Sequence, residues 1–92
     1  MNTLPPREEI LRRIRKVVLD ILSTDEAKLS NSSRFQDDLG ADSLDMVTML
    51  MALEDEFGRQ ISDEEAEQLT TIDATADFIV QNFDTLPLQE NP

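Results

Sequence analysis

The chain is organised around the stretch Asp38-Leu39-Gly40-Ala41-Asp42-Ser43-Leu44-Asp45 and the helix that it opens, which we expect to end near Phe57. Gly40 allows a tight turn because glycine tolerates positive φ angles. Asp42 or Ser43 then caps the helix by accepting hydrogen bonds from its first backbone amides. At about 100° per residue, the spacing predicts one buried apolar stripe, made of Met46, Met49, Leu50, Leu53 and Phe57.

The same helix carries a second apolar stripe on its opposite side. This stripe consists of Leu44, Val47 and Met51, and the side chains between them are acidic or polar: Asp45, Thr48, Glu54 and Asp55. A helix with two apolar sides contacts its own core on one side and either more of its own chain or another molecule on the other. Buried carboxylates need partners, and basic residues are scarce nearby. The pattern therefore favours an exposed stripe that binds another protein.

Composition limits the chemistry available to the chain. Its 92 residues are enough for one domain with a single core, and we expect one domain over residues 1–92. The sequence contains no His and no Cys, so it offers no imidazole base, no thiolate nucleophile and no disulfide. Zinc ligation is not expected, and the ligand spacing of a calcium loop is absent. We expect neither enzymatic activity nor a metal site.

Charge is distributed unevenly along the chain. Residues 1–34 hold seven of the eight basic side chains, whereas residues 35–92 hold fifteen acids and a single basic residue, Arg59. Such a field repels nucleic acids and anionic membranes and speeds encounter with basic proteins, although acids can also serve only to keep a small protein soluble. No long apolar run occurs. We expect a cytoplasmic monomer that neither binds nucleic acid nor inserts into a membrane.

Periodicity predicts three more helices. One covers about residues 6–22, with apolar residues at three- and four-residue steps and a basic run between them that we expect to be solvated. A short helix at about 63–69 begins with a capping box formed by Ser62 and Glu65. A further helix covers about 72–84. No strand is predicted.

The connection over residues 23–42 shows no lasting period and is long for so small a domain. We expect it to be ordered by apolar contacts from Leu29, Phe35 and Leu39. The predicted fold is therefore all-α, a four-helix bundle with a short third helix and a long loop between helices 1 and 2. Its core is expected to span about residues 6–84, with frayed tails at 1–5 and 85–92.

The central motif continues with Val47, Met51-Ala52-Leu53-Glu54-Asp55-Glu56-Phe57, Ile61 and Asp63-Glu64-Glu65-Ala66-Glu67. In this order the residues resemble the acyl carrier proteins, from about Arg7 to Phe83. In that family the serine of an Asp-Ser-Leu motif receives 4′-phosphopantetheine from coenzyme A, and the thiol of this arm carries acyl groups as thioesters. The resemblance implies that Ser43 is the attachment residue.

The resemblance also implies two further sets of residues. Phosphopantetheinyl transferases, acyltransferases, condensing enzymes and other acyl-processing enzymes with basic patches would bind the outer face of the central helix. That face comprises Asp42, Leu44, Asp45, Val47, Met51, Glu54 and Asp55. Acyl chains enter between the helices in this family, and the candidates for the lining of that pocket are Met46, Leu50, Leu53, Phe57, Ile61 and Leu69. Each of these is equally a plain core residue.

Two functions stay open at this point. The first is a carrier in fatty-acid, polyketide or related specialised lipid synthesis. The aspartate before Ser43 favours this class over carriers of peptide synthesis, although Thr48 stands where fatty-acid carriers typically have an acid. The second is a non-enzymatic acidic adaptor that docks basic proteins without a prosthetic group. An autonomous hydrolase is disfavoured because the chain has no His.

Overall fold

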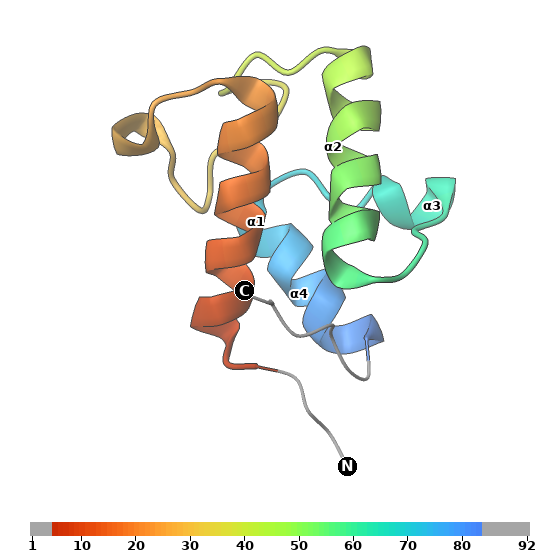
Figure 1. Cartoon of the computed structure of the whole chain (residues 1–92). Coiled ribbons are helices and arrows are strands. Elements are labelled where there is room, and N and C mark those ends of the chain that lie inside the picture. The colour runs from red at the N-terminus through yellow and green to blue at the C-terminus, as the bar shows by residue number, and fades with distance from the viewer. Residues whose placement is uncertain (1–4, 84–92) are drawn as a thin grey trace.

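The computed structural model describes residues 5–83 and contains four α-helices and one short 3₁₀-helix (Figure 1). In chain order these are α1 (Arg7–Leu22), η1 (Glu26–Lys28), α2 (Ser43–Phe57), α3 (Asp63–Ala66) and α4 (Ile72–Asn82). The predicted all-α bundle with a short third helix and a long first loop is confirmed. The expected tails at 1–5 and 85–92 lie outside the described residues except for residue 5.

The helices pack around α1. In Figure 1, α1 and α2 lie side by side and run in opposite directions, α4 crosses behind them, and α3 lies beside α2. α1 contacts both α2 and α4. The most completely buried large apolar side chains come from all three long helices and the loop: Ile10, Ile14, Val18, Phe35, Met49, Leu53, Phe57, Ile72 and Ile79. Among the described residues, no helix has the length and apolar character needed to cross a membrane.

The basic run of α1 is not uniformly solvated, and this part of the prediction is wrong. The side chain of Arg13 is only 4% exposed. Its Nε lies 3.4 Å from a carboxylate oxygen of Glu56 and 3.6 Å from one of Glu9, and its guanidinium lies 5.8 Å from the centre of the Phe57 ring. The aliphatic stem of an arginine can be buried while its charged head meets acids and an aromatic face. Arg13 therefore ties α1 to α2.

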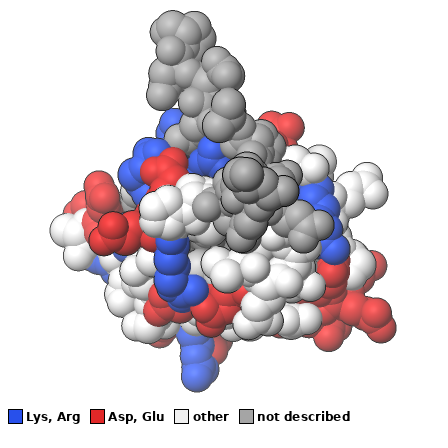
Figure 2. Space-filling model, turned by 90° about the horizontal axis from the view of Figure 1, so that it is seen from below, with Lys and Arg blue, Asp and Glu red and all other residues white. Residues whose placement is uncertain are grey.

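Other basic side chains of α1 are paired with acids at the surface. Arg7 Nη1 lies 2.6 Å from Asp77 Oδ1 of α4, and Arg12 Nη2 lies 2.6 Å from Glu9 Oε2. In Figure 2, blue basic and red acidic side chains accordingly lie next to one another. This pairing weakens the attraction that the basic run alone would exert on phosphate groups.

The long loop is ordered by its apolar side chains, as predicted. Leu29 and Phe35 are buried and Leu39 is half-buried. Within this loop the structure adds one 3₁₀ turn, η1, where the carboxylate of Asp25 accepts a hydrogen bond from Ala27 N at 3.3 Å.

The loop is also joined to the connection between α3 and α4. Phe35 N donates to Thr70 O at 3.0 Å, and Asp73 N donates to Asn31 O at 2.9 Å. The first of these bonds belongs to an isolated bridge between Arg34 and Thr71, and no strand occurs in the described part of the chain. Two segments far apart in sequence are thereby held side by side.

Two helix ends differ from the prediction. α3 ends at Ala66 instead of residue 69, because Gln68 N bonds to Glu65 O and Leu69 N to Ala66 O, both at 3.0 Å. These i→i+3 bonds continue the chain as tighter turns. α4 ends at Asn82 because Phe83 adopts an extended conformation (φ −110°, ψ 134°). The capping box of Ser62 and Glu65 is present as predicted.

Candidate attachment site and binding faces of α2

α2 begins with a capping box made by two aspartates. Asp42 Oδ1 accepts a hydrogen bond from Asp45 N at 2.8 Å, and Asp45 Oδ2 accepts one from Asp42 N at 3.2 Å. The sequence left open whether Asp42 or Ser43 provides the cap, and the structure assigns it to Asp42. Ser43 therefore occupies the first helical position with its side chain exposed and without a capping role.

The turn before Ser43 is anchored in the core. Gly40 has φ +74°, the left-handed conformation that glycine adopts without strain. The next residue, Ala41, is buried, and its amide donates to Phe35 O at 2.9 Å. Because Phe35 is itself fully buried, the start of α2 is held firmly at one end of the bundle.

The second apolar stripe faces solvent. Leu44 is 73% exposed, Val47 54% and Met51 63%, values that are unusual for large apolar side chains in a small folded domain. The acids of the expected outer face differ among themselves. Asp42 and Asp55 are exposed, whereas Asp45 and Glu54 are half-buried. Asp42, Asp45 and Glu54 each accept a backbone hydrogen bond.

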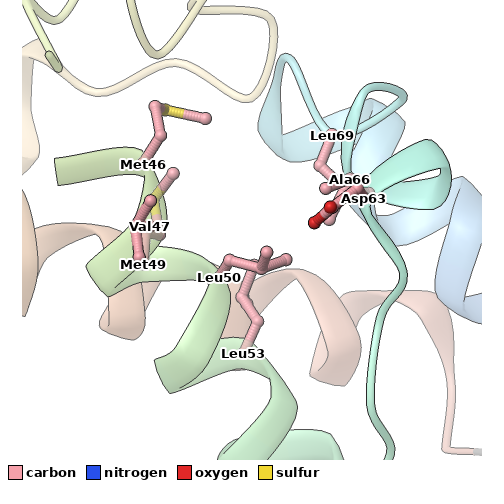
Figure 3. Close-up of a pocket in the computed structure, with 8 residues that line it drawn as sticks. All are labelled: Met46, Val47, Met49, Leu50, Leu53, Asp63, Ala66 and Leu69. Carbon is pink, nitrogen blue, oxygen red and sulfur yellow. The ribbon is translucent and has the colours of Figure 1, made fainter. Parts of the chain in front are cut away.

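The opposite side of α2 forms one wall of an apolar cavity of about 210 Å³, and α3 with the turn after it forms the other wall (Figure 3). Four of the six expected pocket residues line this cavity: Met46, Leu50, Leu53 and Leu69. Phe57 and Ile61 are buried in the core but are not part of the lining. The remaining lining residues are Met49, Asp63, Ala66 and Val47; Val47 belongs to the outer stripe and also borders the cavity.

A second cavity, of about 530 Å³, adjoins the first and shares Met46, Ala66 and Leu69 with it. Its other lining residues are mostly polar: Arg34, Phe35, Gln36, Asp37, Glu67 and Thr70. Sequence reasoning missed this cavity because its walls are the long loop and the connection after α3. These two segments are far apart in the sequence and are joined by backbone hydrogen bonds between them.

The connection leading into α3 is fixed by electrostatic contacts. The amide of Ser62 donates to Glu65, and this hydrogen bond, helped by Arg59, lowers the pKa of the Glu65 carboxyl. Arg59 Nη2 lies 3.2 Å from Glu65 Oε2, and its guanidinium lies 4.9 Å from the centre of the Phe83 ring. Arg59 therefore links the start of α3 to the end of α4.

Comparison with known proteins identifies the class. Residues 12–79 match the family model described as a phosphopantetheine attachment site. The chain is also 45% identical over 76 residues to the acyl carrier protein of Rubrobacter xylanophilus, a match that covers 83% of this chain and 94% of the relative. The chain belongs to the acyl carrier protein family. Acyl carrier proteins are carriers and not catalysts, and phosphopantetheine is their prosthetic group.

In this acyl carrier protein, α2 brings three features together. Ser43 lies at its exposed beginning, the stripe of Leu44, Val47 and Met51 lies on its outer side, and the apolar cavity lies on its α3 side. Since residues three apart on a helix share a face, Met46 is the cavity residue nearest to Ser43 along that face. Ser43 therefore lies within one helical turn of Leu44 in the outer stripe and of Met46 in the cavity lining.

Proposed function

We propose that Ser43 accepts the 4′-phosphopantetheine arm and that the loaded protein carries acyl groups as thioesters between enzymes. The observation that carries this proposal is the exposed hydroxyl of Ser43 at the first position of α2, beside a cap supplied by Asp42. The residues present fit the group. A phosphodiester on Ser43 lies at the positive end of the α2 dipole, where backbone amides favour a phosphate.

The attachment reaction needs a separate transferase. A serine hydroxyl is a weak nucleophile without an adjacent base, and this chain contains no His or Cys. In the proposed reaction the bond between Ser43 Oγ and phosphorus forms as the pyrophosphate bond of coenzyme A breaks. The leaving group is 3′,5′-ADP, and the serine proton passes to a base on the transferase. This chain is thus the substrate of that enzyme.

The outer face of α2 is proposed to bind the transferase and the acyl-processing enzymes. Leu44, Val47 and Met51 form the apolar centre of this face, and the exposed carboxylates of Asp42 and Asp55 lie at its rim. Desolvated apolar contacts contribute affinity, whereas rim charges set orientation and association rate. Partners with basic patches around an apolar centre, such as condensing enzymes and acyltransferases, complement this arrangement.

The cargo is proposed to be an acyl intermediate of fatty-acid, polyketide or related specialised lipid synthesis, carried as a thioester. The support is the mainly apolar lining of the cavity between α2 and α3, because a hydrocarbon chain gains free energy on leaving water for such a cavity. We also propose that the carrier works as a monomer, which leaves the outer face of α2 open to its successive partners.

Intact-mass measurement tests the attachment. Apo-protein is incubated with coenzyme A and a promiscuous phosphopantetheinyl transferase, and we expect the mass of one arm to be added. Ser43→Ala should abolish the addition. Ser62→Ala is a matched control, since Ser62 also opens an acidic helix but serves as its cap. If folded wild-type protein stays unmodified, the carrier proposal is wrong and the acidic adaptor takes its place.

A further inference from the structure

We propose that Met51 is an oxidation site through which hydroperoxides weaken the binding of this carrier to its enzymes. The inference rests on the proposed function, because Met51 lies in the apolar centre of the proposed partner face. The modification is the two-electron oxidation of the thioether to a sulfoxide, which converts an apolar side chain into a polar one. It adds a modification site, and with it a form of regulation, to that face.

Composition directs peroxide chemistry to methionine in this chain. The sequence has four Met and no Cys, His, Trp or Tyr, so no thiol of its own competes for the oxidant. Three of these methionines lie in the described part of the chain, and all three belong to α2: Met46, Met49 and Met51.

The three methionines differ sharply in exposure. Met51 is 63% exposed, Met46 is half-buried, and Met49 is only 1% exposed. Met46 and Met49 line the apolar cavity between α2 and α3, whereas Met51 is not part of that lining (Figure 3). Because the oxidant must reach the sulfur atom, we expect Met51 to be oxidised first and Met49 last.

The surroundings of Met51 allow the modification without unfolding. Met51 borders an open notch of about 360 Å³, whose lining includes Glu54, Asp55 and Gln60. In the free protein a sulfoxide oxygen at this position remains hydrated, so it leaves no polar group buried without a partner. Oxidation of Met51 should therefore change the stability of the folded protein very little.

Docking changes this balance. Leu44 and Val47 precede Met51 by seven and four residues, so the three side chains share one side of α2, and all three are exposed. A partner that covers this stripe removes water from its centre. A sulfoxide at Met51 would then lose its hydrogen bonds to water against an apolar surface, which opposes binding.

The reaction needs only a hydroperoxide. The Met51 sulfur donates an electron pair to the terminal peroxide oxygen, the sulfur–oxygen bond forms, and the oxygen–oxygen bond breaks. The departing oxygen takes up the proton and leaves as water or an alcohol. Sulfur is oxidised by two electrons and the peroxide is reduced by two. A reductase that uses two thiols reverses the change, since it removes the oxygen as water and forms a disulfide.

Peroxide treatment of apo-protein tests the site. Apo-protein is used because the thiol of the arm would itself be oxidised. Tandem mass spectrometry locates the added oxygen, and we expect it first on Met51. After removal of the peroxide, kcat/KM of a promiscuous phosphopantetheinyl transferase for the oxidised protein should fall roughly five- to thirty-fold. Tm should stay unchanged, and methionine sulfoxide reductases should restore kcat/KM.

Three variants make the result specific, and each is compared with its own untreated sample. Met51→Leu keeps an apolar side chain but has no thioether, so peroxide should leave its kcat/KM unchanged. Met46→Leu retains Met51 and should lose as much as the wild type. Met51→Gln places a polar group at the same position and should resemble the oxidised wild type without any treatment.

The outcomes separate the two proposals. Untreated, folded wild-type protein that cannot be loaded overturns the proposed function and this inference with it. Protein that loads normally, and equally well after Met51 is oxidised, overturns only the inference. An equal loss in Met51→Leu, oxidation of Met46 or Met49 before Met51, or a fall in Tm that accompanies the loss does so as well.

Discussion

The carboxylate of Glu54 accepts a hydrogen bond from the backbone amide of Ile61 at 2.7 Å. Ile61 is buried and directly precedes Ser62, the cap of α3. The bond therefore fixes the connection between the two walls of the apolar cavity. Asp55, the next residue along α2, is exposed. Two neighbouring acids of the expected partner face thus have different structural environments.

Glu54→Ala is expected to lower the free energy of unfolding by about 1 to 3 kcal/mol, because it leaves a poorly solvated backbone amide without its acceptor. Asp55→Ala should change it by less than about 0.5 kcal/mol, as is usual for an exposed side chain, and should slow association with a basic partner. Urea unfolding measures the first effect and stopped-flow binding the second. Equal destabilisation by the two substitutions would contradict the structural role of Glu54.

The cap of α2 gives a second prediction. Asp42→Ala should destabilise the protein by about 1 kcal/mol, since it removes the acceptor for the amide of Asp45. Asp42→Asn should have little effect on stability, because asparagine is an equally good N-cap. Thermal unfolding of both variants is the measurement. A loss of stability in Asp42→Asn that matches the loss in Asp42→Ala would mean that the charge, and not the cap, matters.

Much of the fold follows from short-range patterns in the sequence. The capping box at Ser62 and the start of α2 at Asp42 and Ser43 depend on residues within one turn of each helix end, although the sequence did not decide which of Asp42 and Ser43 is the cap. The opposite stripes of α2 likewise follow from helical spacing alone. These features could be predicted because neighbouring residues determine them.

Features that depend on several segments could not be predicted in the same way. The burial of Arg13 requires Glu56 and Phe57 from another helix. The second cavity exists because Phe35 bonds to Thr70, 35 positions further along the chain, and no local pattern encodes that pairing. Helical spacing placed Phe57 and Met46 on one stripe. In the structure Phe57 is buried in the core, whereas Met46 lines the cavity between α2 and α3, and helical spacing does not determine where α3 packs.

The Glu65 carboxyl gives a pH-dependent prediction. Its pKa is lowered from 4.5, first by the hydrogen bond from Ser62 and then by Arg59, so folding favours its charged form. Its contribution to stability is present above pH 4.5 and is lost as the pH falls through the lower pKa of the folded state. The difference in Tm between wild type and Glu65→Gln should therefore close in acid. A difference of the same size at pH 7 and at about pH 3 would contradict this prediction.

The acid-rich part of the chain should make stability depend on salt. Residues 35–92 contain fifteen acids and one basic residue, and several of these acids lie in or beside α3. Charges at the surface interact over distances of up to about 30 Å at 0.01 M salt, but only up to about 8 Å at 0.15 M, because salt screens them. Repulsion among these acids is therefore reduced at the higher concentration. We expect Tm to rise between the two, with amide exchange slowing most in α3 and the turn after it.

Glu67→Gln tests the origin of this effect. Glu67 is exposed and follows the last residue of α3, where a negative charge also opposes the helix dipole. Removing that charge should raise Tm at low salt and reduce its further rise with added NaCl. The matched variant Glu8→Gln removes an exposed acid from the first turn of α1, where a negative charge is favourable, and should not raise Tm at low salt. A wild-type Tm that is independent of ionic strength would show that repulsion among the acids does not limit the stability of this bundle.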